Sequence, residues 1–151
     1  MGTSRIRFRI AEEELGSGVL LTVAPVVDGV PLAEHARRHE LRPATAVKQA
    51  DLAGRYAGLV VGRRSVTADW TRWYLGQGES VFGDGDTCLL GCVCGDTGCW
   101  PLTAMVEIGP ATVRWHRFRN GHRDWDLGGL GPFVFARDSY ERALAEPELV
   151  A

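Results

Sequence analysis

Residues 5–10 alternate strictly between arginine and apolar side chains. Successive side chains of a β-strand point to opposite faces, so the pattern predicts a strand with one buried and one solvent-facing side. A second apolar run, residues 19–27, follows a glycine-containing turn at residues 15–18. We expect the two runs to pair as a hairpin.

The remaining patterns predict an α+β fold. Pro31 is well placed to open a helix over residues 32–41, residues 46–54 fit a short helix, and the Asp138–Glu141 capping-box pattern predicts a last helix that stops before Pro147. Trp70, Trp73 and Tyr74 lie in a run read as a strand of mixed core and surface, and they could also line a ligand pocket or a partner interface. Further strands are expected at 59–61, 88–94, 99–108, 112–119 and 133–135, with a hairpin turn at Asn120-Gly121. We therefore expect a single domain over residues 1–151, with a mostly antiparallel sheet and two or three helices.

Composition limits the partners and the location. The formal net charge of −2 gives no overall attraction to nucleic acid or to an anionic membrane. The first ten residues lack the apolar run of a secretory signal, and no membrane-spanning apolar stretch occurs. Lys48 is the single lysine among many arginines, which is typical of a bacterium with a GC-rich genome. We expect a cytoplasmic protein, in which thiols stay reduced.

All four cysteines lie between residues 88 and 99. A cluster this tight indicates a shared partner, either a metal ion or one another, and a reducing compartment favours metal or free thiols over disulfides. In an extended strand Cys92 and Cys94 lie about 7 Å apart on one face, and Cys88 lies about 13 Å from Cys92. Across a turn at residues 95–98, Cys94 faces Cys99. The predicted site is therefore Cys92, Cys94 and Cys99, in the Cys-rich hairpin of residues 87–108.

A structural zinc site needs a fourth ligand. If the chain reverses at Gly109-Pro110, the ladder brings His122 beside Cys99, which makes His122 the first choice. Cys88 is the alternative, provided that Gly91 bends the strand. Zinc is the expected ion, and copper(I) is the second choice because it also prefers thiolates. A catalytic zinc would keep one position open and use a base, for which Asp96 and Glu107 are candidates.

Two readings without metal remain open. Cys94 and Cys99 could form a cross-strand disulfide or a redox pair, although they lack the C-x-x-C spacing that usually lowers a thiol pKa. The four thiols could also be unliganded. No Ser nucleophile elbow and no phosphate-binding loop accompany the cluster, so no catalytic residue is assigned.

The segment from Cys92 to Cys99 reads C-x-C-x4-C, with a glycine after its second cysteine. It resembles the zinc knuckle that follows the catalytic domain of SET-type lysine methyltransferases. That family's cofactor signatures have no counterpart here, so the resemblance implies zinc and not methyl transfer. The wider pattern G-C-x-C-G-x-x-G-C-W-P-L at residues 91–102 also resembles a small bacterial, actinobacterial-looking family, and this likeness implies no function.

Two other segments carry weaker signals. His35 and His39 share one face of the first predicted helix and could bind metal, but their highly charged surroundings favour a solvated surface. Residues 114–125 interleave arginine and histidine with aromatic residues, a pattern that would suit RNA, DNA or an anionic small molecule. A hairpin with Trp115 packed inward is the simpler interpretation.

The sequence thus favours a binding or interaction module whose partner is another protein or a small molecule. A thiol-redox or metal-dependent enzyme that uses the same cysteines is the first alternative. Nucleic-acid binding through residues 114–125 is the second.

Overall fold

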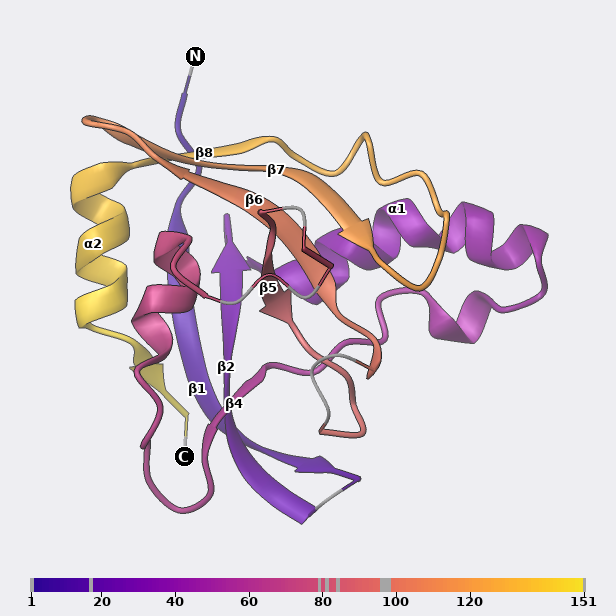
Figure 1. The fold of residues 1–151 in the computed structure, drawn as a ribbon, viewed down its shortest axis with the longest axis horizontal. Coiled ribbons are helices and arrows are strands. Elements are labelled where there is room, and N and C mark those ends of the chain that lie inside the picture. The colour runs from indigo at the N-terminus through magenta and orange to yellow at the C-terminus, as the bar shows by residue number, and fades with distance from the viewer. Residues whose placement is uncertain are drawn as a thin grey trace.

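The structure is a computed structural model that describes residues 2–16, 18–78, 80, 82–83, 85–95 and 99–150. They form an α+β fold with two mostly antiparallel sheets, which confirms the predicted class (Figure 1). In chain order the elements are β1 (Ile6–Leu15), β2 (Gly18–Val27), β3 (Val30–Pro31), α1 (Leu32–Ala46), the 3-10 helix η1 (Ala50–Leu52), β4 (Leu59–Gly62), the 3-10 helix η2 (Trp70–Leu75), β5 (Thr87–Leu90), β6 (Leu102–Ile108), β7 (Thr112–Asn120), β8 (Phe133–Ala136), α2 (Arg137–Ala145) and β9 (Glu148–Leu149).

The first sheet is built on the predicted hairpin of β1 and β2. These strands pair antiparallel along their whole length, from Ile6 opposite Val27 to Leu15 opposite Gly18. The apolar face of β1 is buried, as the alternation predicts. β3 and β4 pair with β2, and β9 adds a short parallel strand to β1.

The second sheet has the order β5-β6-β7-β8. Residues 87–108 do form an antiparallel hairpin, in which Cys88 lies opposite Thr103. Its strands are shorter than expected, because β5 ends at Leu90 and β6 begins at Leu102. Cys92, Cys94 and Cys99 therefore belong to the connection between the strands.

Two isolated bridges join the sheets. Ser4, just before β1, pairs in parallel with Phe135 of β8, and Ala57, just before β4, pairs antiparallel with Gly91, just after β5. Because β4 also pairs with β2, the ladders close into one ring of strands. We call the Ala57–Gly91 bridge the seam. It consists of two hydrogen bonds, from Ala57 N–H to Gly91 O at 2.9 Å and from Gly91 N–H to Ala57 O at 2.8 Å.

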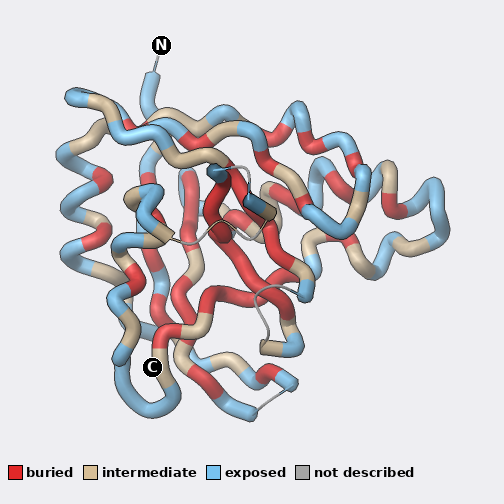
Figure 2. Tube along the Cα trace, in the orientation of Figure 1, coloured by how far each residue is buried: buried red, intermediate tan, exposed pale blue. Residues whose placement is uncertain are grey.

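Aromatic side chains fill the space between the sheets. The ring centroids of Phe8 and Tyr74 lie 4.7 Å apart, and those of Trp115 and Phe135 lie 4.9 Å apart. Two hydrogen bonds pair polar atoms within this core: Trp115 Nε1–H donates to the Tyr140 hydroxyl at 3.1 Å, and the Tyr74 hydroxyl donates to Leu89 O at 2.8 Å. Figure 2 shows that buried residues gather on the central strands, whereas the outer end of α1 is largely exposed.

Several predicted boundaries were wrong. The first helix begins at Leu32, directly after Pro31, as predicted, but it continues past Leu41 to Ala46 with Pro43 inside it. The missing Pro43 N–H would have met the carbonyl of His39, which lies on an exposed turn where water can satisfy it. After Ala46, the end of α1, the expected helix over residues 46–54 is reduced to η1. The expected strand with Trp70 and Tyr74 is the 3-10 helix η2, whose two aromatic side chains pack in the core.

The end of the chain also differs from expectation. Asn120-Gly121 does not form a two-residue hairpin, because the next strand, β8, begins only at Phe133. Instead Arg123 N–H donates to Asn120 O at 3.1 Å, which turns the chain into a long connection. No capping box opens α2: its N-cap is Ala136, and Glu141 pairs with Arg137 at 2.6 Å.

Glu40 of α1 is a fully buried carboxylate that joins three parts of the fold. Its Oε1 accepts the Gly54 N–H at 2.7 Å and its Oε2 accepts the Tyr56 hydroxyl. The same hydroxyl accepts a hydrogen bond from Asn120 Nδ2 at 3.2 Å. The network ties α1 to the segment before β4 and to the end of β7, so it supports the seam from one side.

We expect Glu40→Gln to weaken the pH dependence of stability. Burial raises the Glu40 pKa above its ordinary 4.5, despite hydrogen bonds from Tyr56 and Gly54 that lower it. The folded state therefore binds more protons than the unfolded state, and Glu40 reduces stability as pH rises from 4.5 through the raised pKa. Urea unfolding at pH 5 and pH 8 should show a smaller loss for the variant than for wild type. Exposed Glu14→Gln is the control, and equal losses in all three proteins would contradict the role of Glu40.

Candidate metal centre

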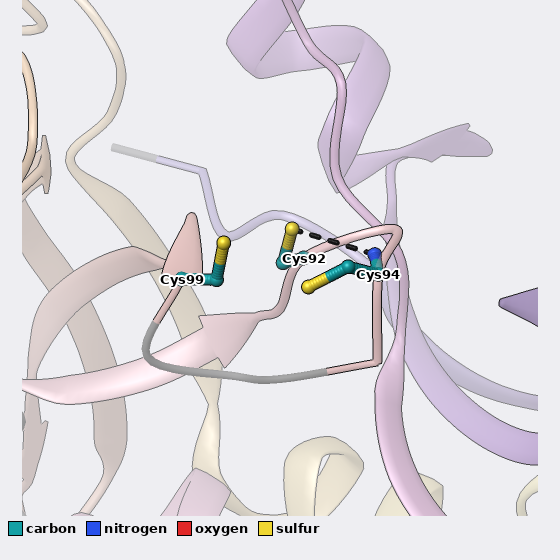
Figure 3. Close-up of side chains that lie close together, drawn as sticks. All are labelled: Cys92, Cys94 and Cys99. Atoms are coloured by element: carbon teal, nitrogen blue, oxygen red, sulfur yellow. Dashed lines mark hydrogen bonds between the residues drawn. The ribbon is translucent and has the colours of Figure 1, made fainter. Parts of the chain in front are cut away.

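Three of the four cysteines converge in the connection between β5 and β6. The Sγ atoms of Cys92, Cys94 and Cys99 all lie within 4.8 Å of one another. Figure 3 shows the three sulfurs gathered around a common space, with Cys92 between the other two in this view. Tetrahedral zinc with Zn–S bonds of about 2.3 Å places its sulfurs about 3.8 Å apart. The three thiols can therefore reach one ion with only small side-chain movements.

The seam determines where this group begins. Gly91 is held by both seam hydrogen bonds, and Cys92 is the next residue. Gly95 N–H donates to Cys92 O at 3.0 Å, which turns the chain, and Cys94 N–H donates to Cys92 Sγ at 3.4 Å. Burial raises the Cys92 pKa, and the N–H bond from Cys94 lowers it by a smaller amount because it favours the thiolate form.

The loop also rests on the tip of the β1–β2 hairpin. Gly16 N–H donates to Val93 O at 3.3 Å, and Val93 packs against the buried side chains of Leu15, Leu20 and Ala57. A Cβ on Gly16 would lie 2.9 Å from Cys94 O, so only glycine allows this approach. Nothing in the spacing of the cysteines indicates this contact, which sequence reasoning missed.

The burial of the thiols divides them into two pairs. Cys94 and Cys99 are exposed, whereas Cys92 and Cys88 are buried. Burial raises the Cys92 pKa, and it raises that of Cys88 to about 12, with a further contribution from the charge of Asp86. Because a metal binds the thiolate, an ion bound to Cys92 would displace the proton of that thiol.

The two candidates for a fourth ligand are not in the group of close ligand atoms. Cys88 lies in β5 and packs into the main core. The His122 ring lies edge-on to Phe82, with centroids 5.7 Å apart, and its backbone N–H donates to Asn120 Oδ1 at 2.9 Å. Among the described residues, the one group of ligand atoms this close contains sulfur alone. His122 thus stays a prediction.

The other predicted metal and base residues lie in different settings. His35 Nε2 lies 2.9 Å from Val27 O, and His39 is exposed farther along α1. Glu107 contacts His116 at 2.7 Å near the far end of β6, about 17 Å from Leu102 by strand rise. It is therefore no base for the cysteine group. Asp96 lies outside the described residues.

Two arginines within residues 114–125, Arg119 and Arg123, make side-chain contacts within the protein. Trp115 is fully buried, as predicted. The Arg123 guanidinium lies over Trp100, 4.6 Å from the ring centroid, and 5.9 Å from that of Trp125. Arg119 lies over Phe82 and 3.7 Å from Asp86 Oδ2. These contacts use surfaces that a nucleic acid would otherwise meet, so they do not favour that alternative.

Comparison with known proteins adds no further constraint. No family model, no curated protein and no solved structure matches the chain. Across the described ranges, no helix is both long and apolar enough to cross a membrane. The cysteine group is therefore the feature from which a function can be argued.

We expect the metal-free thiols to react in two classes. Cys94 and Cys99 are exposed, whereas Cys88 and Cys92 are buried and have raised pKa values that leave little thiolate at neutral pH. Brief treatment of chelated, reduced protein with iodoacetamide at pH 7.5 should label the first pair at least about tenfold faster, read by peptide mass spectrometry. Equal rates at all four cysteines would contradict the arrangement.

Proposed function

We propose that this protein binds one thiophilic metal ion at Cys92, Cys94 and Cys99, and that the ion holds the β5–β6 connection in place. The observation that carries the proposal is the approach of the three Sγ atoms to within 4.8 Å of one another. One zinc ion could use all three sulfurs at once, because thiolates are among its preferred ligands. The resemblance to a zinc knuckle points the same way.

Zinc is the ion that we favour. Zinc binds thiolates strongly, accepts the tetrahedral geometry that flexible loops can supply, and has no redox chemistry that would oxidise its ligands. Copper(I) is the second choice, because three soft sulfurs also suit it. Both ions require reduced thiols, so we place the protein in the bacterial cytoplasm.

The ion would bind next to the seam, where two hydrogen bonds join the strands. The seam closes the ring of strands through two hydrogen bonds, and the cysteine loop starts at one of its two residues. A metal that cross-links Cys92 to Cys99 would restrain the loop and keep Val93 on the hairpin tip. We infer a small binding module in which this loop presents a fixed surface to a protein or a small molecule.

A thiol-redox role is the second candidate, and one observation favours it. Cys94 and Cys99 are both exposed, and their sulfurs lie close enough for a modest movement to form a disulfide. An oxidised pair would exclude the metal, so the two functions are distinguishable by thiol titration together with metal analysis.

The first test is metal content in matched cysteine variants. Wild-type protein purified without chelator should carry one zinc per chain. Cys92→Ala, Cys94→Ala and Cys99→Ala should each weaken zinc binding more than about a hundredfold, because losing a ligand costs more affinity than losing a residue that only hydrogen-bonds to a ligand. Cys88→Ala should keep the zinc, because Cys88 packs in the core. Zinc competition with a chromophoric chelator gives the affinities.

Metal-free wild type with four titratable thiols would contradict the proposal. A Cys94–Cys99 disulfide in protein prepared under reducing conditions would replace it with the redox role. Loss of zinc in Cys88→Ala, with zinc retained in the other three variants, would show that the ion is bound at Cys88 and not at the three proposed ligands.

A second test concerns the seam. Removing the ion should speed amide hydrogen exchange at Ala57 and Gly91 by at least about tenfold, because local opening there loses its restraint. The amide of Val23, a core residue of β2, serves as the internal control. NMR-detected exchange before and after chelation measures both. Unchanged exchange at Ala57 and Gly91 would contradict a role for the ion at the seam.

A further inference from the structure

The cysteine group supplies three ligands, and that number has a consequence for the ion. Structural zinc sites are closed by four protein ligands, whereas sites with three protein ligands keep one position for water or substrate. Within the part of the chain that the structure describes, the group contains Cys92, Cys94 and Cys99 and no His, Asp or Glu. The inference below rests on the proposed metal binding.

The fourth position has access to solvent. Cys92 is buried at the base of the group, whereas Cys94 and Cys99 are exposed. An ion held by the three sulfurs, which gather around a common space in Figure 3, would therefore have one buried and two exposed ligands. A small molecule could therefore approach it without a change in the fold.

We propose that the fourth coordination position of this ion is open and binds the sulfur of a small-molecule thiol. Three thiolates select a thiophilic ion, and such an ion favours sulfur over oxygen in its last position. The step is a ligand exchange: the metal–sulfur bond forms as the metal–water bond breaks, the S–H proton leaves to solvent, and no electron is transferred. The ion then holds a thiolate, which is the nucleophilic form of sulfur.

Two residues of the chain compete with this assignment. His122 could turn toward the ion from the end of β7, as the ladder arithmetic predicts. Asp96, which lies between Cys94 and Cys99 in the sequence, could supply a carboxylate. Either residue would occupy the fourth coordination position, and an added thiol could then not bind the ion. The test must therefore distinguish an open site from one that the chain itself closes.

Cobalt(II) in place of zinc makes the coordination visible, because its visible absorption reports ligand number and its near-ultraviolet bands report Co–S bonds. Cobalt-loaded wild type is titrated with 2-mercaptoethanol, with 2-(methylthio)ethanol as the matched control that has no ionisable S–H. We expect a saturable rise in the Co–S band with the thiol and none with the thioether. The apparent affinity should increase about tenfold per pH unit below the thiol pKa, because binding releases one proton.

Two control measurements test whether the thiol removes the metal and whether a second copy of the protein supplies the fourth ligand. Gel filtration after the titration must recover cobalt with the protein, since thiol can also strip a metal. The spectrum without thiol must be the same at low and high protein concentration, which shows that a second copy does not donate the fourth sulfur. Cobalt stripped without a new protein-bound spectrum, or a concentration-dependent spectrum, overturns the proposal.

The remaining outcomes distinguish a failure of the metal site from a failure of the open fourth position. If cobalt does not bind at all, the proposed metal site itself fails. If cobalt binds through the three cysteines and thiol leaves the spectrum unchanged, while His122→Ala or Asp96→Ala alters it, the site is closed and the open-position proposal is wrong. Thiol binding that persists unchanged in both variants supports the open position.

Discussion

The two hydrogen bonds between Ala57 and Gly91 are the constraint on which the rest of the structure depends. They connect the sheet built on β1 and β2 to the sheet built on β5 and β6, and with the Ser4–Phe135 bridge they close the strands into a ring. The aromatic core lies inside this ring, so the packing of Phe8 against Tyr74 and the position of Gly91 depend on one another. A closed ring also limits the exposed sheet edges that could pair with other chains.

The cysteine group follows from this closure. With Gly91 held at the seam and Leu102 paired in β6, the intervening chain must turn within ten residues, and the turn brings Cys92, Cys94 and Cys99 together. Gly16 then allows the hairpin tip to approach Cys94 closely enough for a backbone hydrogen bond to Val93. Glu40 and Tyr56 support the opposite side of the seam through a buried hydrogen bond. The site is thus a surface loop with both ends held by rigid structure, as a preorganised metal centre requires.

Sequence reasoning predicted the parts that depend on local periodicity. It predicted the alternation in β1, the pairing of β1 with β2 and the separation of Cys88 from the other cysteines. These features follow from the spacing of residues along a strand, which determines the face on which each side chain lies. The long connection after Asn120 was not predicted, since a hairpin signal describes only the turn and not the strand that must follow it. The helical conformation around Trp70 and Tyr74 was missed because burial of both rings in the core overrides local preference. The seam and the contact of Gly16 with the cysteine loop join distant segments, and no single-sequence pattern encodes them.

The central claim is that one ion is bound by three cysteine sulfurs of this loop. Zinc K-edge X-ray absorption tests it most directly, because the first shell reports ligand type and distance. The protein is purified from zinc-supplemented cells and kept reduced with a phosphine, so that no added thiol contributes sulfur. We predict a shell of sulfur at about 2.3 Å, with three sulfurs from wild type and two from Cys94→Ala if any zinc remains. A first shell made only of nitrogen and oxygen, or a sulfur shell unchanged in Cys94→Ala, would contradict the account.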